Sequence, residues 1–313
     1  MNNIIEKYID SKDIKLSSKN VYIRNLKKLY SILNYDQEKN ILLELQNPKE
    51  IFKKINEYKN DNGKELSDSG KKGLISLCLI LSYSFKPNNE DLFKKIYNEY
   101  LEELKKYNKS IDQKYSKKEE KNMKGITIKD LKKVSTLWGR RFKKSKNKLD
   151  LFLYLISTMY SNLKYPRRNI YITVKIISDI SENDGKNNFL LLSENRNRFI
   201  FNDTKNSSKY ELKIAKNSVF LRVLSIYLRN RLNQSSDYLL LSPYTGKRLN
   251  SSQLTKFVQL AYKPLGEKIG SSTIRKIFIT DKLKNSVPLK KRTEWSKGMG
   301  NSTKTQSLYY EKH

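Results

Sequence analysis

The 313-residue sequence contains one cysteine, one histidine and no long apolar segment. The single cysteine, Cys78, excludes a disulfide framework or a cysteine zinc site within one chain. It lies in the apolar run LISLCLILSYSF, which predicts a position in a helix core. The single histidine, His313, excludes Ser-His-Asp and Cys-His catalysis and histidine-rich metal sites. A catalytic site in this chain must therefore use Arg, Lys, Tyr, Ser or carboxylate side chains.

Membrane and secretion signals are also missing from the sequence. No segment reaches the ~18 or more consecutive apolar residues of a membrane span. The N-terminal stretch MNNIIEKYIDSKDIK does not resemble a signal peptide, because its apolar run is short and is interrupted by acids. We therefore expect a soluble, intracellular protein with no membrane partner.

Acidic residues are scarce relative to basic ones: 32 Asp and Glu stand against 64 Lys and Arg, which gives a net charge of +32. Such an excess repels itself unless a polyanion shares the surface, and nucleic acid binds with release of counterions. The abundance of Lys, Asn, Ile and Tyr also fits an AT-rich genome, such as that of a virus or mobile element. Arginine is less affected by that bias, and 12 of the 13 arginines lie at or beyond Arg140. We therefore expect the chemistry in the second half of the chain.

Hydrophobic periodicity predicts an N-terminal helical domain over residues 1–107, with basic outer faces. Residues 108–124 are dense in charge and lack apolar periodicity, which favours a linker, although an extension of the preceding helix fits the same pattern. The expected helices cover residues 17–34, 47–61, 67–85 and 89–107.

The second domain, residues 125–313, mixes helical and strand patterns. Helices are expected over residues 127–142, 147–163, 217–233, 251–266 and 272–285, and strands joined by hairpins over 171–177, 187–194, 197–203 and 209–215. The predicted fold class is therefore α+β, mostly α, with a small antiparallel β-sheet in a mainly helical domain.

Four short features of this second domain carry basic or nucleophilic side chains. In LKYPRRNIY, a proline ends a helix and presents Arg167 or Arg168 at the corner. In FNDTKNSSKYELK, Lys205 lies in a turn between two strands. In IGSSTIRKIFIT, Arg275 lies near the start of an apolar helix. The C-terminal MGNSTKTQSLYYEKH contains two adjacent tyrosines, the second of which is Tyr310. Each feature alone is a weak indication of function.

Taken in this order, the features resemble the catalytic half of the tyrosine recombinases, or phage-type integrases, over about Gly125 to Tyr310. The family's His-x-x-Arg box reads Ser272-Thr273-Ile274-Arg275 here, and its Leu-Gly-His-Ser box reads Met299-Gly300-Asn301-Ser302. Tyr310 follows Asn301 by nine positions, which matches the family's spacing, whereas Tyr309 is one position short. The N-terminal helical domain is compatible with the family's core-binding domain.

The first arginine box of the family runs apolar-Arg-x-x-acid. With Pro166 at the apolar position, Arg167 becomes the catalytic arginine and Ile170 stands where an acid is usual, while Arg168 remains the alternative. The sequence also departs from the family at its two imidazole positions, which Ser272 and Asn301 occupy. Neither side chain titrates near neutral pH, but both donate hydrogen bonds. These replacements put the rate of reaction in doubt.

The resemblance implies a DNA strand transferase, a site-specific recombinase or integrase that works through a 3′-phosphotyrosine intermediate. The implied catalytic residues are Arg167, Lys205, Ser272, Arg275, Asn301 and Tyr310. It also implies no metal or small-molecule cofactor, binding of double-stranded DNA between the two domains, and a homo-tetramer on two duplexes. For a viral protein, the location is the host cytoplasm or nucleus.

Three other functions remain open on the sequence alone. A type IB topoisomerase shares the Arg, Lys and Tyr chemistry but reseals one duplex as a monomer. A metal-dependent nuclease would use Glu211 and Lys213 on one strand together with Asp203 upstream. A catalytically decayed DNA-binding protein would bind DNA with steep salt dependence without forming a covalent adduct.

Overall fold

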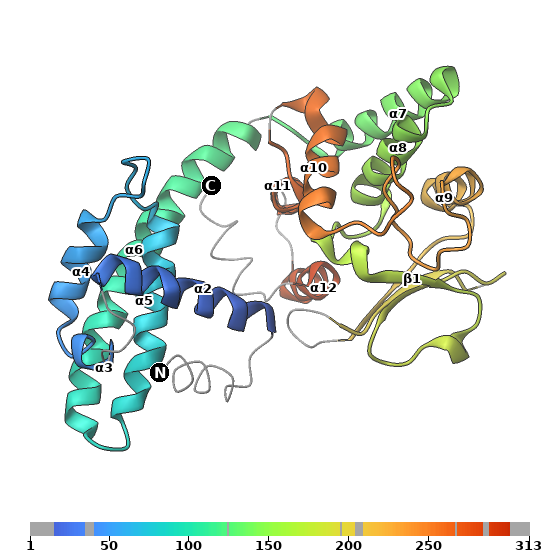
Figure 1. Ribbon diagram of the computed structural model, residues 1–313. Coiled ribbons are helices and arrows are strands. Elements are labelled where there is room, and N and C mark those ends of the chain that lie inside the picture. Colours follow the sequence, from blue (N-terminus) through green and yellow to red (C-terminus); the bar gives the residue numbers. More distant parts are fainter. Residues whose placement is uncertain are drawn as a thin grey trace. The chain divides into compact units, whose positions relative to one another are not determined.

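The computed structural model describes residues 16–34, 41–123, 125–194, 196–203, 209–266, 268–283 and 288–300. Two compact units divide between Lys118 and Glu119, within helix α6 (Glu90–Met123) (Figure 1). Residues 108–123, for which the sequence favours a linker, continue helix α6, so this charged stretch extends the preceding helix. In the ranges given above, no helix is long and apolar enough to cross a membrane.

The first unit is built from α2 (Leu16–Leu33), α3 (Ile41–Glu44), α4 (Pro48–Glu57), α5 (Asp68–Ser82) and most of α6. The predicted helices are confirmed, and α3 is an additional short one. Ser67 caps α5, because its side chain accepts a hydrogen bond from the Gly70 backbone N–H at 3.2 Å. Cys78 is fully buried in the core, and this burial raises the pKa of its thiol to about 12. The thiol is therefore protonated and packs as an apolar side chain, as predicted.

The second unit surrounds helix α8 (Lys148–Asn162), nearly all of whose residues are buried. Helices α7 (Ile128–Ser145), α9 (Val219–Asn230) and α10 (Ser251–Tyr262) pack against it. The chain then forms α11 (Ser271–Leu283) and α12 (Leu289–Met299). A helix that is apolar on all sides needs cover on all sides, which explains why α8 lies at the centre.

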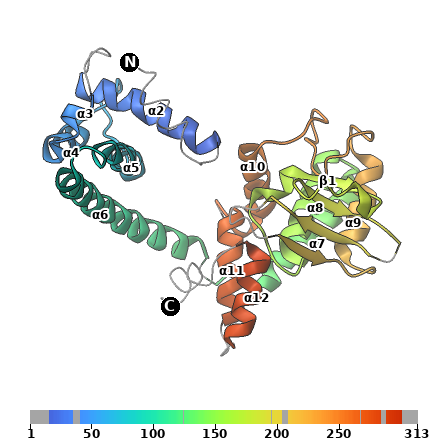
Figure 2. The same cartoon turned by 90° about the horizontal axis from the view of Figure 1, so that it is seen from below.

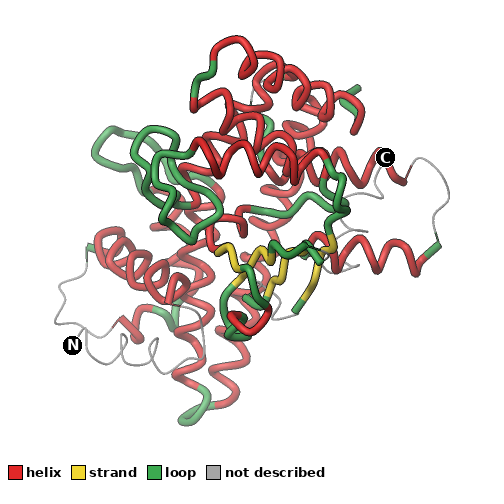
Figure 3. The backbone as a smooth tube through the Cα atoms, turned by 90° about the vertical axis from the view of Figure 1, so that its right-hand side faces the viewer, coloured by secondary structure: helices red, strands yellow, loops and turns green. Residues whose placement is uncertain are grey.

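Four short strands form one sheet in the order β1 (Val174–Ile177), β2 (Asn188–Leu191), β3 (Arg198–Phe201) and β4 (Tyr210–Lys213) (Figure 3). All four predicted strands are confirmed, and β2–β3 and β3–β4 are antiparallel. The expectation of a purely antiparallel sheet is wrong, because β1 pairs with β2 in parallel. The connection 178–187, which includes a short 3-10 helix, returns the chain so that both strands run the same way.

Both faces of the sheet carry buried side chains, because successive residues of a strand point to opposite faces. Phe199 and Phe201 of β3 face the main core of the unit, which also contains α8 and α9. Ile200, between them, lies on the opposite face in a small cluster with Ile177, Phe189 and Leu191.

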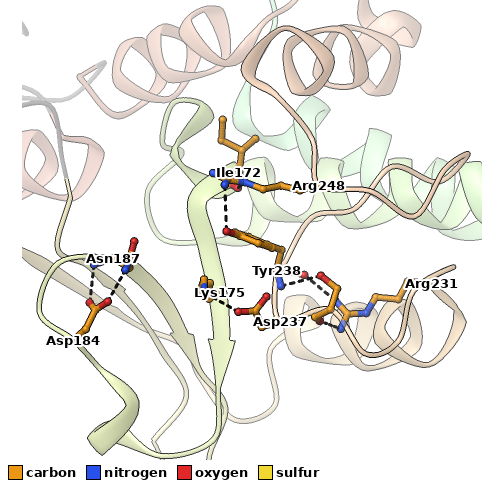
Figure 4. A network of polar contacts seen from close by, with 9 residues as sticks. Ile172, Lys175, Asp184, Asn187, Arg231, Asp237, Tyr238 and Arg248 are labelled. Atoms are coloured by element: carbon orange, nitrogen blue, oxygen red, sulfur yellow. Dashed lines mark hydrogen bonds and ion pairs between the residues drawn. The ribbon is translucent and has the colours of Figure 1, made fainter. Parts of the chain in front are cut away.

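The outer edge of β1 is covered by the segment 237–239, which is held by side chains as well as by backbone hydrogen bonds (Figure 4). The Arg248 guanidinium stacks over the Tyr238 ring at 4.4 Å and donates to the Ile172 carbonyl at 3.0 Å. Lys175 forms an ion pair with Asp237 at 2.8 Å. These contacts protect the edge strand, and they give Lys175 and Arg248 partners within the fold.

Candidate active site

The corner after α8 separates the two adjacent arginines of the PRR motif. Arg167 is only 2 % exposed, whereas Arg168 is exposed to solvent. The Arg167 Nε donates to the Gly298 carbonyl at 2.7 Å, and its Nη2 donates to the Lys297 carbonyl at 3.2 Å. The inward-facing arginine therefore contacts the last turn of α12.

Arg275 reaches the same turn of α12 from a different element. It is 2 % exposed, on α11 between buried Ile274 and Ile277, and its Nη2 donates to the Met299 carbonyl at 3.2 Å. Figure 2 shows both helices, α11 and α12, in the second unit. The last carbonyls of a helix lack partners within the helix and form the negative end of its dipole, so they attract guanidinium groups. Three successive carbonyls thus bring Arg167 and Arg275 together.

Two aromatic rings support the Arg167 guanidinium. Its central carbon lies 4.0 Å from the ring centre of Phe201 and 4.8 Å from that of Tyr210. These two residues are direct partners across β3 and β4, so the hairpin presents them as one surface. Cation–π contacts favour the charged form, whereas burial lowers the pKa of Arg167 to about 10. The guanidinium therefore remains charged at neutral pH.

The connection between β3 and β4 contains Lys205, which lies outside the described residues. The start of that connection is held by Asn188, which is 1 % exposed. The Asn188 amide nitrogen donates to the Asp203 carbonyl, and its amide oxygen accepts from the Asp203 N–H. The Phe201–Tyr210 pair that supports Arg167 is the one nearest this connection along both strands. A role for Lys205 stays a prediction from the sequence, on the connection that follows this pair along the chain.

Helix α12 is attached to the corner after α8 by its side chains as well as by Arg167. Glu294 accepts from Lys164 Nζ at 2.8 Å and from the Tyr165 hydroxyl at 2.7 Å. One turn later, Gly298 lies directly against the Tyr165 ring, where a Cβ atom would be only 2.2 Å from a ring carbon. Only glycine allows this close approach.

Alanine at Gly298 is expected to destabilise the second unit by about 1–3 kcal/mol, the usual cost of overpacking. The added methyl must displace the Tyr165 ring, and this outweighs the gain of about 1 kcal/mol in helix propensity. Chemical denaturation measures the change. Gly270→Ala is the matched control, because a Cβ there meets nothing within 4 Å. A Gly298→Ala protein as stable as the wild type would contradict this close packing.

The pH dependence of the α12 attachment follows from Glu294 and Lys164. Hydrogen bonds from Lys164 and Tyr165 lower the Glu294 pKa below 4.5, so this carboxylate stabilises the fold above pH 4.5 and loses its effect as the pH falls through the lowered value. The hydrogen bond to Glu294 raises the Lys164 pKa above 10.5, so its contribution is present below pH 10.5 and is lost as the pH rises through the raised value. We expect Glu294→Gln to lower stability most between these limits, by a small amount because both groups are solvated. Urea denaturation across the pH range tests this, and a constant difference down to pH 2 would contradict it.

Ser272 lies at the start of α11, exposed and one helical turn before Arg275. The neighbouring Ser271 donates to Asn169 Oδ1 at 3.2 Å, and the Asn169 amide donates to Thr255 Oγ1 at 2.7 Å. The start of α11 is therefore held by the loop that follows Arg167 and by α10. Ser272 remains exposed on the same element as Arg275.

Three further residues proposed from the sequence, Asn301, Tyr309 and Tyr310, lie outside the described residues. The last described residue is Gly300, which ends α12 with φ = +70°. A Cβ atom at this position would lie 3.7 Å from Arg167 Nη1. The chain thus leaves the described part beside Arg167, one residue before Asn301.

The sequence did not predict α12, the helix that joins the two arginines. Its residues, LKKRTEWSKGM, lack a continuous apolar stripe and contain an internal glycine. The available signal was Pro288 immediately before the helix and Gly300 immediately after it. Tyr165, Tyr210 and Glu294 were not singled out either, because ordinary residue types carry no local pattern for these contacts.

One of the acidic residues named for a nuclease site has an ion-pair partner on the neighbouring strand. Glu211 pairs with Arg198 on the neighbouring strand at 3.5 Å. Within the described ranges, there is no group of three or more His, Cys, Asp or Glu side chains placed to hold a metal ion. The E-x-K pattern on β4 is thus accommodated by a cross-strand ion pair.

Comparisons with known proteins add little to this description. No protein-family model and no curated protein matches the sequence. Among solved structures, a crystal structure of XerA recombinase is similar at 15% sequence identity and a TM-score of 0.40, over 99% of this chain and 92% of that chain. A similarity at this level does not establish function, which must be argued from the residues themselves.

Proposed function

We propose that this protein is a site-specific DNA recombinase or integrase that cleaves and rejoins DNA through a 3′-phosphotyrosine intermediate. One observation carries the proposal: Arg167 and Arg275, far apart in the sequence, are both buried and meet at the last turn of α12. The segment that follows this turn contains Asn301 and Tyr310. The resemblance to tyrosine recombinases implies that two arginines and a tyrosine act on one phosphate, and the proposal places Tyr310 with this arginine pair.

The charge of Arg167 supports an anionic substrate. Within the described part of the chain, its hydrogen bonds go to backbone carbonyls, and no carboxylate forms an ion pair with it. A buried guanidinium without a carboxylate carries an uncompensated charge, and a phosphodiester would supply the missing negative charge. Guanidinium groups also suit the paired oxygens of a phosphate better than ammonium groups do.

In the proposed reaction, the Tyr310 oxygen forms a bond to the scissile phosphorus while the bond to the 5′ oxygen breaks. Arg167 and Arg275 bind the nonbridging oxygens, on which charge develops in the transition state. The leaving 5′ oxygen takes a proton from the Lys205 ammonium, and the tyrosine hydroxyl releases its own proton to solvent. A 5′-hydroxyl then attacks the phosphotyrosine, which reverses these changes and rejoins the strand.

Ser272 and Asn301 are proposed to assist by hydrogen bonding rather than by proton transfer, because neither side chain titrates near neutral pH. The exposed position of Ser272, one turn before Arg275, suits a contact with a phosphate oxygen. The backbone N–H groups at the start of α11 would add to the attraction for that anion.

The partner in this proposal is double-stranded DNA, which the basic surface of the +32 chain would attract. By analogy with the family, the active assembly is a tetramer on two duplexes, and no metal or small-molecule cofactor takes part. A type IB topoisomerase would instead act as a monomer on one duplex. Transfer of a strand between two labelled duplexes distinguishes these two activities.

The test is covalent trapping on DNA that the protein selects. Duplexes bound from a random-sequence library are rebuilt with a nick a few nucleotides beyond each candidate phosphate. Cleavage then releases a short fragment that carries the 5′-hydroxyl, and its loss prevents rejoining. A complex that survives denaturation, with nucleotides attached to a tyrosine peptide by mass spectrometry, is the expected result. Tight binding to the selected sequence without any adduct would contradict cleavage and favour a DNA-binding protein that has lost its catalytic activity.

A further inference from the structure

A groove of about 960 Å³ lies in the second unit. It is lined mainly by residues of α7 and α9, two helices that both pack against α8. On α7, its lining residues lie at positions 132, 135, 136, 139, 140 and 143, which form one face of that helix, and at 142. On α9 they recur at positions 219, 222, 226 and 230. None of the lining residues belongs to 163–168, α11 or α12, so the groove is distinct from the arginine site.

The groove has an apolar base and a basic border. Phe142, Tyr154, Val219 and Ile226 supply its apolar surface. Gly139 lets the Tyr154 ring pack closely against α7, because a Cβ there would lie 2.9 Å from that ring. The cations along it are Lys132, Arg140, Lys143, Lys146 and Arg222, and no acidic residue lines the groove.

The dimensions of the groove suit a helix. The lining positions on α7 from Lys132 to Lys143 extend over about 16 Å, at about 1.5 Å per residue. A helix of three turns has this length, and amphipathic helices commonly place an apolar stripe into a groove between two helices. Here the flanking residues of such a helix would face cations on both sides.

We propose that this groove binds an amphipathic helix of a protein partner, with a narrow apolar stripe flanked by Asp and Glu. The apolar base excludes water beneath the stripe, and the basic border selects the acidic flanks. A DNA backbone fits less well, because phosphate groups gain nothing from the surfaces of Phe142, Tyr154, Val219 and Ile226. The site is therefore a protein-docking surface separate from the proposed DNA reaction.

The experiment uses the full chain and a fluorescent 16-residue peptide with leucines at i, i+3, i+4 and i+7 and glutamates on both flanks. Fluorescence anisotropy is expected to show saturable binding that weakens as salt rises. A scrambled peptide has the same charge without the stripe, and a third peptide has serines in place of the leucines. Both are expected to bind at least tenfold more weakly. The whole chain attracts anions, but only the groove offers apolar side chains that the leucine stripe can contact.

Charge reversal locates the site. The double variant Arg140→Glu with Arg222→Glu is expected to weaken peptide binding at least tenfold. The matched control is Lys144→Glu with Arg229→Glu, which changes exposed residues of the same two helices outside the groove and produces the same net charge. The control is expected to bind the peptide nearly as well as the wild type does, and circular dichroism melting checks the folding of both variants.

Two results would overturn the proposal. One is equal binding of the designed and scrambled acidic peptides, which would mean general attraction by a basic protein. The other is a selective loss of duplex DNA binding in Arg140→Glu with Arg222→Glu, without a selective loss of peptide binding. That result would identify the groove as a nucleic-acid surface instead. The proposal is supported if the two double variants bind DNA equally well and only Arg140→Glu with Arg222→Glu loses peptide binding.

Discussion

Phenylalanine at Tyr310 is expected to abolish the covalent protein–DNA complex while leaving DNA binding intact. The substitution removes only the hydroxyl oxygen, which is the nucleophile of the proposed reaction. With Tyr310 as the nucleophile, the adduct should therefore fall to background on a nicked duplex of the selected sequence. Denaturing gel electrophoresis measures the adduct, and fluorescence anisotropy on the same duplex measures binding.

Tyr309→Phe is the matched control for this experiment, because it removes a hydroxyl from the adjacent position. It should retain the adduct. An adduct lost only in Tyr309→Phe would move the nucleophile by one residue and invalidate the spacing of nine positions from Asn301. An adduct retained in both single variants would mean that neither tyrosine is required as the nucleophile.

Lysine at Arg167 is expected to slow DNA cleavage by about 10²-fold or more, the usual effect of losing a preorganised donor to a developing charge. The Arg167 guanidinium donates through both Nε and Nη2 to α12 while its plane stacks on Phe201. A lysine keeps the charge but has neither the planar fork nor the stacking surface. Single-turnover cleavage of the nicked duplex gives the rate, and DNA affinity should change little.

Arg168→Lys is the control for the neighbouring position, because Arg168 is exposed where Arg167 is buried. Its cleavage rate should remain close to that of the wild type. The reverse result, with a slow Arg168→Lys and a normal Arg167→Lys, would assign the catalytic arginine to Arg168. Thermal melting of both variants separates a loss of chemistry from a loss of folding, which matters because Arg167 also attaches α12.

Helix α12 links folding to the proposed chemistry. Arg167 and Arg275 bind its last carbonyls, while Tyr165 packs on Gly298 in the same turn. A change that loosens α12 therefore removes the anchor that both arginines share. For this reason, a structural substitution such as Gly298→Ala is expected to reduce DNA cleavage as well as stability.

Local patterns in the sequence were sufficient for most helices and for all four strands. Helix α8 and strand β3 were recognisable as apolar runs of helix and strand length, because each is buried on opposite sides at once. The parallel pairing of β1 with β2 was not recognisable, because strand direction depends on the path of 178–187 and on cover from residues 237–239. Neither leaves a periodic pattern in β1 itself.

The sequence by itself determined the elements and the chemical inventory: a basic, mostly helical chain whose arginines, lysine and tyrosines are the available catalytic groups. Only the tertiary structure decided that Arg167 points inward, that Arg275 meets it, and that a helix without an apolar stripe joins them. The physical reason is that propensity and periodicity are local, whereas these contacts join the corner after α8, the middle of α11 and the end of α12. Carbonyl groups at a helix end carry no side-chain signature, so the partners of both arginines are invisible until the chain is folded.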